Sequence, residues 1–279
     1  MQNAGIAALG LNWRYLAFEV HPEKLRDAIT GAKAMKFIGV NLTVPHKLLA
    51  LDMVDVLDES ARTWGAVNTI RFEAQTDDGL WRPFREWPDA SPERIRSHGF
   101  NTDADAITRS IREDLKMELK EAKVLLLGAG GAGRTAALKL AAEGVSELFL
   151  VNRTLNKVES LVREISQRYP GVKTALGYPD ASARVDLVLN ATSLGLKAGD
   201  GSPLDTAQYS LSRAGAAYDM IYRPAETAFL VAAQKGGCRV ANGLGMLLYQ
   251  GAKALELWSG LNPPIEVMRE ALRKNVYGN

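Results

Sequence analysis

The order of hydrophobic and polar positions predicts that helices and strands alternate along most of the chain. Residues 22–35 carry apolar side chains at helical spacing, whereas residues 37–43 form a short run typical of a strand. The same pattern predicts helices at 3–9, 103–119, 135–142, 246–258 and 264–274, and strands at 13–19, 66–73, 124–127, 147–151, 173–176, 187–190 and 216–219. Such alternation is typical of the α/β fold class, in which helices cover both faces of a parallel sheet.

Residues 76–97 interrupt this pattern with turn-forming and aromatic residues. The segment contains Trp81, Trp87, Pro83, Pro88 and Pro92. We expect an elaborated hairpin connection rather than a separate domain. Such a connection either shapes access to a site or decorates the surface.

Composition limits the classes of protein to consider. A chain of 279 residues with 47% hydrophobic content can bury a large core and is long enough for two domains. Its net charge of +2 comes from 34 basic and 32 acidic residues in a mixed pattern, which argues against nucleic-acid binding and against a polybasic membrane patch. The sequence has no apolar run long enough to span a membrane and no signal-peptide pattern, so we expect a cytoplasmic protein.

The chain contains few of the cysteine and histidine residues that disulfides and many metal sites need. Cys238 is the only cysteine, so neither an internal disulfide nor a cysteine-based metal site is expected. The three histidines, His21, His46 and His98, are scattered along the chain. We therefore expect no metal.

A glycine-rich turn follows the apolar run at 124–127. Residues 123–134 have the sequence KVLLLGAGGAGR, in which Gly128 permits a tight turn, Gly130 lets the backbone approach a pyrophosphate, and Gly133 lets the next helix pack closely. Free amides at the start of that helix favour an anion. The strand before the turn and the helix after it favour dinucleotide binding over a purely structural turn.

The next predicted strand ends in Asn152, Arg153 and, one turn later, Lys157. An acidic side chain at this point would bind the ribose hydroxyls of NAD, whereas a guanidinium can pair with the 2′-phosphate of NADP. Because two cationic side chains stand where an acidic one would bind NAD, the sequence favours NADP over NAD. The alternative is a solvated basic helix start.

Residues 41–47 (NLTVPHK) place polar side chains at the carboxyl end of a predicted strand, where α/β sheets hold their ligands. Lys47 is a candidate acid there, although a lysine is more often a solvated surface charge. Further polar segments at 65–69, 99–103 and 242–250 suit a polyhydroxylated ligand, but each taken separately is equally consistent with a turn or a cap.

Eight motifs in order make the chain resemble the shikimate dehydrogenase family along nearly its whole length. They lie at residues 41–47, 65–69, 101–103, 128–133, 152–154, 190–193, 218–224 and 243–250. The resemblance implies two α/β domains, both with mainly parallel sheets. Residues 1–103, completed by helices within 246–279, would bind substrate, and residues 104–245 would form a Rossmann-like NADP-binding domain.

The resemblance also implies roles for individual residues. The catalytic pair would be Lys47 and Asp103. The substrate ligands would be Asn41, Thr43, Asn68, Tyr222 and Gln250. The cofactor contacts would be Gly128, Ala129, Gly130, Gly131, Ala132, Asn152, Arg153, Thr154, Lys157, Thr192, Met220, Gly243 and Met246.

The activity implied by the resemblance is the NADP-dependent, reversible reduction of 3-dehydroshikimate to shikimate, a step of aromatic amino acid biosynthesis. Lysine suits this reaction because its ammonium can donate a proton to the developing alkoxide and stabilise its charge. Two alternatives are a quinate/shikimate dehydrogenase and a non-catalytic NADP-binding paralogue. We expect a small-molecule substrate and a monomer or homodimer.

The sequence departs from the family pattern at its start. Family members normally begin with an extra strand and a loop whose paired serines hold the substrate carboxylate, whereas Met1 here falls at the helix start that follows that loop. Two lost hydroxyl hydrogen bonds to a carboxylate would cost on the order of 1.5 to 3 kcal/mol each. One hypothesis is that the natural protein begins upstream of this Met1.

Overall fold

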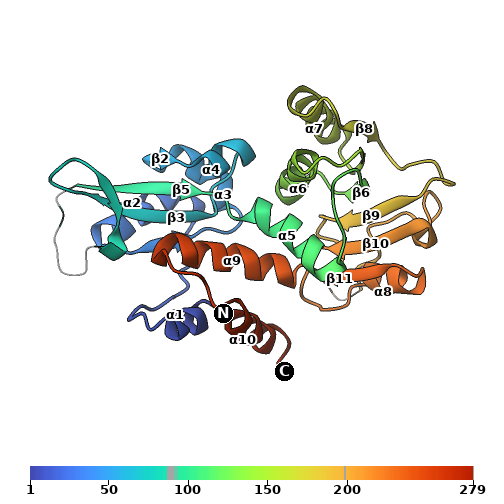
Figure 1. Cartoon of the computed structure of the whole chain (residues 1–279). Coiled ribbons are helices and arrows are strands. Elements are labelled where there is room, and N and C mark those ends of the chain that lie inside the picture. The colour runs from blue at the N-terminus through green and yellow to red at the C-terminus, as the bar shows by residue number, and fades with distance from the viewer. Residues whose placement is uncertain (87–91, 93, 198, 279) are drawn as a thin grey trace. The chain divides into compact units, whose positions relative to one another are not determined.

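The computed structural model describes residues 1–86, 92, 94–197 and 199–278. The chain divides into two compact units, one made of residues 1–103 and 248–279 and the other of residues 104–247 (Figure 1). Each unit contains one sheet and the helices that cover it. The α/β fold class predicted from the alternation of elements is confirmed.

The first unit contains a five-stranded mixed sheet. Its strands are β1 (Gly39–Asn41), β3 (Thr69–Gln75), β5 (Ile95–Phe100) and β2 (Val56–Leu57) in that order, with β4 (Trp81–Pro83) paired to β3. β3 is antiparallel to β1, β4 and β5, and β2 is parallel to β5, so β3 alone runs against the others. Three of the four strand pairings in this sheet are therefore antiparallel, and the mainly parallel arrangement that was expected is found in the sheet of the second unit.

The side chains of β3 separate into two faces because successive residues of a strand point to opposite sides. Ile70 and Phe72 are fully buried in a core shared with Leu25 and Ile29 of α2 (Leu25–Ala34). The indole of Trp258 donates to the Ile70 carbonyl oxygen at 3.0 Å. The remaining helices of this unit are α1 (Gln2–Ala8), α3 (His46–Leu49), α4 (Glu59–Trp64), α10 (Ile265–Tyr277) and, extending from the second unit, α9 (Leu244–Ser259).

The predicted strand at residues 13–19 is wrong. Leu11, Trp13 and Tyr15 are partly buried and alternate with exposed residues, but this extended segment pairs with no strand among the described residues. Alternation predicts an extended backbone, whereas a strand also needs a neighbour about 4.8 Å away in the hydrogen-bonding direction. Of the segment at 76–97, β4 returns along β3 as expected of a hairpin, while Trp87 and Pro88 lie outside the described residues.

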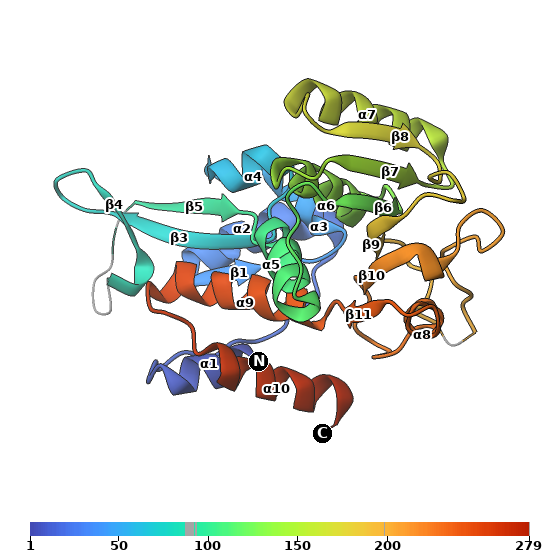
Figure 2. The ribbon, with the colours of Figure 1, turned by 45° about the vertical axis from the view of Figure 1, so that its right-hand side comes forward.

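The second unit contains a six-stranded sheet that is parallel throughout. Figure 2 shows its strands side by side in the order β11 (Arg239–Asn242), β10 (Ala214–Asp219), β9 (Val185–Asn190), β6 (Lys123–Leu127), β7 (Glu147–Val151) and β8 (Lys173–Leu176). α5 (Asp103–Leu115) leads into it, and α6 (Gly131–Ala142), α7 (Leu155–Arg168) and α8 (Ala228–Lys235) connect its strands. Because all six strands are parallel, their carboxyl ends lie at one edge of the sheet, and the loops that follow them meet there.

Candidate active site

Lys47 and Asp103 form a partly buried ion pair in the first unit. Nζ of Lys47, on α3, lies 2.7 Å from Oδ2 of Asp103 at the start of α5, although 56 positions separate the two residues. Their side chains are 28% and 12% exposed, so solvent still reaches the ammonium. The start of a helix favours the carboxylate electrostatically. Within the described part of the chain, Asp103 is the only hydrogen-bond partner of the ammonium, so two of its three hydrogens remain available to a ligand.

Asn68 holds Asp103 in place. Its Nδ2 donates to Oδ1 of Asp103 and to Oγ1 of Thr102, each at 2.9 Å, and its Oδ1 accepts from the Thr102 amide at 2.8 Å. Asn101 closes the same turn, because its Oδ1 accepts from the Asp103 amide at 3.1 Å. Both amide hydrogens of Asn68 therefore go to protein acceptors, and they fix the carboxylate that faces Lys47.

Asn41 belongs to the same polar cluster. Its Nδ2 donates to Oγ1 of Thr69 at 3.0 Å and to the Asn68 carbonyl oxygen at 3.3 Å, and its Oδ1 accepts from the hydroxyl of Tyr15 at 3.0 Å. Burial raises the pKa of Tyr15 above its usual value. The cluster thus joins β1, β3 and the extended segment that contains Tyr15.

The structure brings four of the residues predicted for catalysis and substrate binding into this one cluster: Asn41, Lys47, Asn68 and Asp103. Thr43 is exposed on the turn before α3, and Gln250 is partly buried on α9, which also belongs to the first unit at that position. Tyr222 is 37% exposed and lies in the second unit, in the loop after β10. Thr43 and Gln250 thus lie in the same unit as the cluster, and Tyr222 lies in the other unit.

The glycine turn after β6 has the open backbone that a pyrophosphate needs. Gly128 has a φ of +104°, which favours glycine, and a Cβ at Gly133 would overlap the Gly128 carbonyl oxygen. A Cβ at Gly130 or Gly131 would meet no atom within 4 Å. Since α6 begins at Gly131, its first amides have no acceptor within the helix and border this open space.

The end of β7 is tied to the glycine turn and carries two cations. Oδ1 of Asn152 accepts from the Ala129 amide at 3.0 Å, and its Nδ2 donates to the Thr154 carbonyl oxygen at 2.9 Å. Arg153 and Lys157 are exposed, and in the described ranges neither forms an ion pair. This donor set fits a phosphate group beside the turn.

Buried polar side chains connect the ends of β9 and β10. Asn190 donates to Oδ1 of Asp219 at 2.9 Å and accepts from the amide and hydroxyl of Thr192 at 2.9 and 2.8 Å. Asp219 also accepts from the Ile221 amide at 3.0 Å and from the Thr227 hydroxyl at 2.6 Å. Burial raises the pKa of Asp219, because these neutral donors do not offset it.

Met220 and Gly243 are neighbours at the same edge. The Met220 amide donates to the Asn190 carbonyl oxygen at 2.9 Å, and a Cβ at Gly243 would overlap the Met220 carbonyl oxygen. All residues predicted to contact the cofactor consequently follow five adjacent strands, in or just beyond the loops after β6, β7, β9, β10 and β11. They are Gly128, Ala129, Gly130, Gly131 and Ala132; Asn152, Arg153, Thr154 and Lys157; and Thr192, Met220, Gly243 and Met246.

Sequence reasoning missed several members of these clusters. Thr69 and Thr102 lie inside motifs that were recognised, so their proximity to the candidate residues was a usable signal. Asp219 and Asn190 also lie in recognised motifs, but only the fold shows that they bond to each other. Tyr15 had no signal, because its segment was predicted to be a strand.

In the ranges that the structure covers, no group of three or more His, Cys, Asp or Glu side chains is arranged to hold a metal ion. No helix within the same ranges is long and apolar enough to cross a membrane.

Fold and clusters together define an α/β protein with a nucleotide-binding type of sheet edge in one unit and a lysine–aspartate pair in the other. Comparison with known proteins makes this more specific. Three family models match, described as "Shikimate dehydrogenase substrate binding domain" at residues 1–70, "Shikimate / quinate 5-dehydrogenase" at 110–196 and "Shikimate 5'-dehydrogenase C-terminal domain" at 243–273.

Relatives and solved structures agree with the family models. A protein of Methanopyrus kandleri named "Shikimate dehydrogenase (NADP(+))" is 37% identical over 99% of this chain and 90% of its own length. A crystal structure of a shikimate dehydrogenase in complex with NADP+ is 33% identical with a TM-score of 0.82, covering 98% of this chain and 89% of that one. A ligand-free 5-ketofructose reductase of Gluconobacter is 30% identical with a TM-score of 0.79, covering 98% and 92%. The chain belongs to the shikimate dehydrogenase family.

Proposed function

We propose that this chain catalyses the NADP-dependent, reversible reduction of 3-dehydroshikimate to shikimate. The observation that carries the proposal is the ion pair between Lys47 and Asp103, with Nζ 2.7 Å from Oδ2, in a chain of this family. A ketone reduction needs a proton donor at the oxygen that becomes the alcohol. Lys47 has an ammonium that is held by Asp103 and still reached by solvent.

The proposed reaction balances with one hydride and one proton. NADPH, when bound, supplies the hydride to the carbonyl carbon, and the C–O π electrons move to the oxygen. The Lys47 ammonium stabilises that developing alkoxide and then donates its proton to it. The carboxylate of Asp103 orients the ammonium and accepts a hydrogen bond from the alcohol hydroxyl that forms. Solvent then returns a proton to Lys47. The reverse reaction uses the neutral amine of Lys47 as the base.

Substrate hydroxyls and the carboxylate are proposed to bind Asn41, Thr43, Asn68, Tyr222 and Gln250. The exposed Thr43 hydroxyl has no hydrogen-bond partner in the part of the chain that the structure describes, which supports its role as a ligand. Asn68 can reach substrate only by exchanging one of its bonds to Thr102 or Asp103, so its stronger contribution is to position Asp103.

NADP is proposed to bind the domain formed by residues 104–245, and the substrate the domain formed by 1–103 with 246–279. The glycine turn would hold the pyrophosphate at the amides of Gly130, Gly131 and Ala132, since a Cβ at either glycine would meet no protein atom. Arg153 and Lys157 would pair with the 2′-phosphate. Thr192, Met220, Gly243 and Met246 would line the other part of the cofactor site.

The first test is the initial rate of NADP+ reduction by shikimate, with NAD+ and quinate as the alternative pair. We expect turnover with shikimate and NADP+. Lys47→Met should lower kcat by roughly 10²- to 10⁴-fold while the Kd for NADP+ changes less than about twofold. Lys24→Met is the matched control, because Lys24 is a surface lysine whose side chain is 72% exposed.

A second candidate substrate follows from the similarity to a 5-ketofructose reductase. Oxidation of NADPH by 5-ketofructose is therefore measured in parallel. Turnover of 5-ketofructose or quinate without turnover of shikimate would reject the proposed substrate but keep the dehydrogenase chemistry. Binding of NADPH with no turnover of any of these compounds would favour a non-catalytic NADP-binding protein.

The proposal extends to a cytoplasmic protein that acts as a monomer or homodimer. A single cysteine in 279 residues suits a reducing compartment, since no internal disulfide is possible. Light scattering of the purified chain would measure its mass in solution; a trimer or larger assembly would contradict this part of the proposal.

A further inference from the structure

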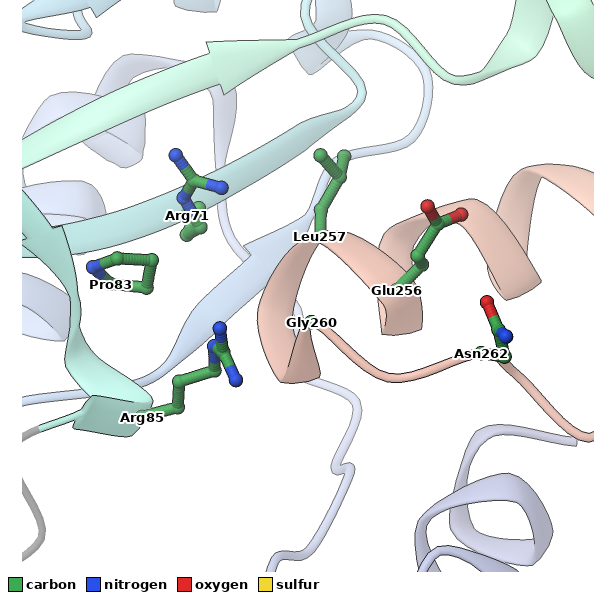
Figure 3. A pocket seen from close by; sticks show the side chains of 7 residues that line it. All are labelled: Arg71, Pro83, Arg85, Glu256, Leu257, Gly260 and Asn262. Carbon is green, nitrogen blue, oxygen red and sulfur yellow. The ribbon is translucent and has the colours of Figure 1, made fainter.

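A cavity of about 250 Å³ lies in the first unit, beside the C-terminal end of α9. None of its lining residues belongs to the candidate active site. Figure 3 shows the guanidinium of Arg85 beside Gly260 at the end of α9, and Arg71 on β3. The lining side chains are Arg71, Pro83, Arg85, Glu256, Leu257 and Asn262.

Several N–H groups that line this cavity have no hydrogen-bond acceptor among the described residues. Nε and Nη2 of Arg71 both donate to Glu73, which leaves Nη1 without a partner among the described residues. Arg85 donates from Nη1 to the Ser259 carbonyl oxygen at 2.7 Å and from Nη2 to Glu86 at 3.3 Å, and its Nε has no partner in the same ranges. The carboxamide of Asn262 is exposed to solvent and likewise forms no hydrogen bond within the described ranges.

The nearby carboxylates already have cationic partners. Oε1 of Glu256 lies 3.0 Å from Nζ of Lys253. Glu73 is buried and receives Arg71, Arg96 and His98. Within the described part of the chain, the unused hydrogen-bonding groups of the lining are therefore Nη1 of Arg71, Nε of Arg85, the amide of Asn262 and one oxygen, Oε2, of Glu256, so N–H donors are in the majority.

Both arginines are held in position by the protein itself. Arg71 lies over the ring of Phe100, with 5.1 Å from its Cζ to the ring centroid. A Cβ at Gly260 would overlap the Arg85 guanidinium, and Gly260 has a φ of +63°, so glycine is favoured there twice over. A ligand would meet two cations that are already ordered, which lowers the entropy lost on binding.

The size and the apolar part of the lining indicate a small organic molecule rather than a bare ion. A volume of about 250 Å³ is several times the roughly 30 Å³ that one water occupies in the liquid. Leu257 and Pro83 offer apolar contact next to the cations. We propose that this cavity binds a small organic oxyanion, with its carboxylate or phosphate group on Arg71, Arg85 and Asn262.

This site is independent of the proposed dehydrogenase reaction but shares a strand with the candidate active site. Arg71 and Thr69 point to the same face of β3, about 7 Å apart along the strand, and Thr69 bonds to Asn41. Binding is tested directly, so the outcome does not depend on turnover.

The test is calorimetric titration of the full chain, saturated with NADP+, with citrate in one arm and inorganic phosphate in the other. NADP+ keeps the probes out of the glycine turn. We expect saturable binding of at least one probe, and the stronger arm identifies the preferred group. Arg85→Gln should weaken it roughly tenfold or more, as expected for the loss of a charged hydrogen bond.

Arg82→Gln is the matched control. Arg82 also pairs with Glu86 and sits on the same strand as Pro83, but it does not line the cavity, so its loss should change the affinity less than about twofold. Asn262→Ala removes no hydrogen bond formed among the described residues and should weaken binding at least threefold without changing the unfolding temperature. Absence of saturable binding, unchanged affinity in Arg85→Gln and Asn262→Ala, or equal losses in Arg85→Gln and Arg82→Gln would each overturn the proposal.

Discussion

Each unit buries a carboxylate in or beside its sheet, and the two are held in opposite ways. Glu73 of β3 is 2% exposed and is surrounded by Arg71, Arg96 and His98. Asp219, at the end of β10, is fully buried and receives bonds from an asparagine, a threonine and a backbone amide, all of them neutral.

The difference in partners reverses the direction in which the two pKa values move. Burial by itself raises the pKa of a carboxyl. For Glu73 the hydrogen bonds from His98, Arg71 and Arg96 outweigh burial and lower the pKa to about 2. For Asp219 burial prevails and the pKa is raised. The sheet of the first unit is therefore stabilised by charge, and the ligand edge of the second by neutral hydrogen bonds that position loops.

The largest expected effect tests how far the second unit depends on that neutral network. Asp219→Ala should lower the free energy of unfolding by about 4 kcal/mol, because it removes three hydrogen bonds and leaves Asn190 and Thr227 buried with lost partners. Urea unfolding measures the change. Asp219→Asn is the control: its oxygen can keep the bonds from Asn190 and Ile221, while its NH2 group cannot accept from the Thr227 hydroxyl, so a loss well above about 2 kcal/mol would show that the charge itself matters.

Acid unfolding should expose the charged network of the first unit. The folded-state pKa of Glu73 lies below its unfolded value, so its contribution, on the order of 3 kcal/mol, is present at neutral pH. It should be lost as the pH falls from about 4.5 towards about 2. Unfolding free energies at pH 7, 5, 4 and 3 test this.

Glu73→Gln is the matched variant for that experiment. It should be less stable than the parent at pH 7 and show a flatter dependence on pH below 5. Equal slopes for the two proteins would assign the acid sensitivity to other carboxylates. Asp219 should show the opposite pH dependence. Because its folded-state pKa is raised, its contribution to the free energy of unfolding weakens as the pH rises through that pKa.

Two glycines of one motif should separate folding from ligand binding in the second unit. Gly133→Ala should cost about 2 kcal/mol, because its Cβ would overlap the Gly128 carbonyl oxygen. Gly130→Ala should leave the unfolding temperature unchanged, since its Cβ would meet no protein atom, yet it should weaken NADP+ binding by occupying the space of the pyrophosphate. Thermal unfolding and fluorescence titration distinguish the two effects; a Gly130→Ala protein that binds NADP+ normally would contradict the assignment of this turn.

The smallest effect concerns the charged loop after β7 at the cofactor edge. Arg153→Gln should weaken NADP+ binding roughly tenfold and leave NAD+ binding within about twofold, because only NADP carries a 2′-phosphate. Arg163→Gln, on α7 and outside the predicted site, serves as the control. Equal loss for both cofactors would place the contribution of Arg153 elsewhere than at the 2′-phosphate.

How much could be predicted from the sequence differs between the two units. Predicted strands at 147–151 and 173–176 coincide with β7 and β8, and the glycine turn falls between β6 and α6. In a parallel sheet each strand and its following loop are contiguous in sequence, so local patterns carry the information. The short β2 and α4 were not predicted, and the strand predicted at 13–19 is absent, because pairing depends on neighbours distant in sequence.

By itself the sequence determined the fold class, the family and the residue types available for chemistry, because glycine spacing, apolar periodicity and ordered motifs are local properties of the chain. Only the tertiary structure decided which of those residues meet. Lys47 contacts Asp103 although 56 positions separate them, and Asn68 donates its amide hydrogens to Asp103 and Thr102. Arg71 and Arg85 line one cavity. Such contacts depend on how strands pair and helices pack, and no local pattern encodes the distance between two side chains on different elements.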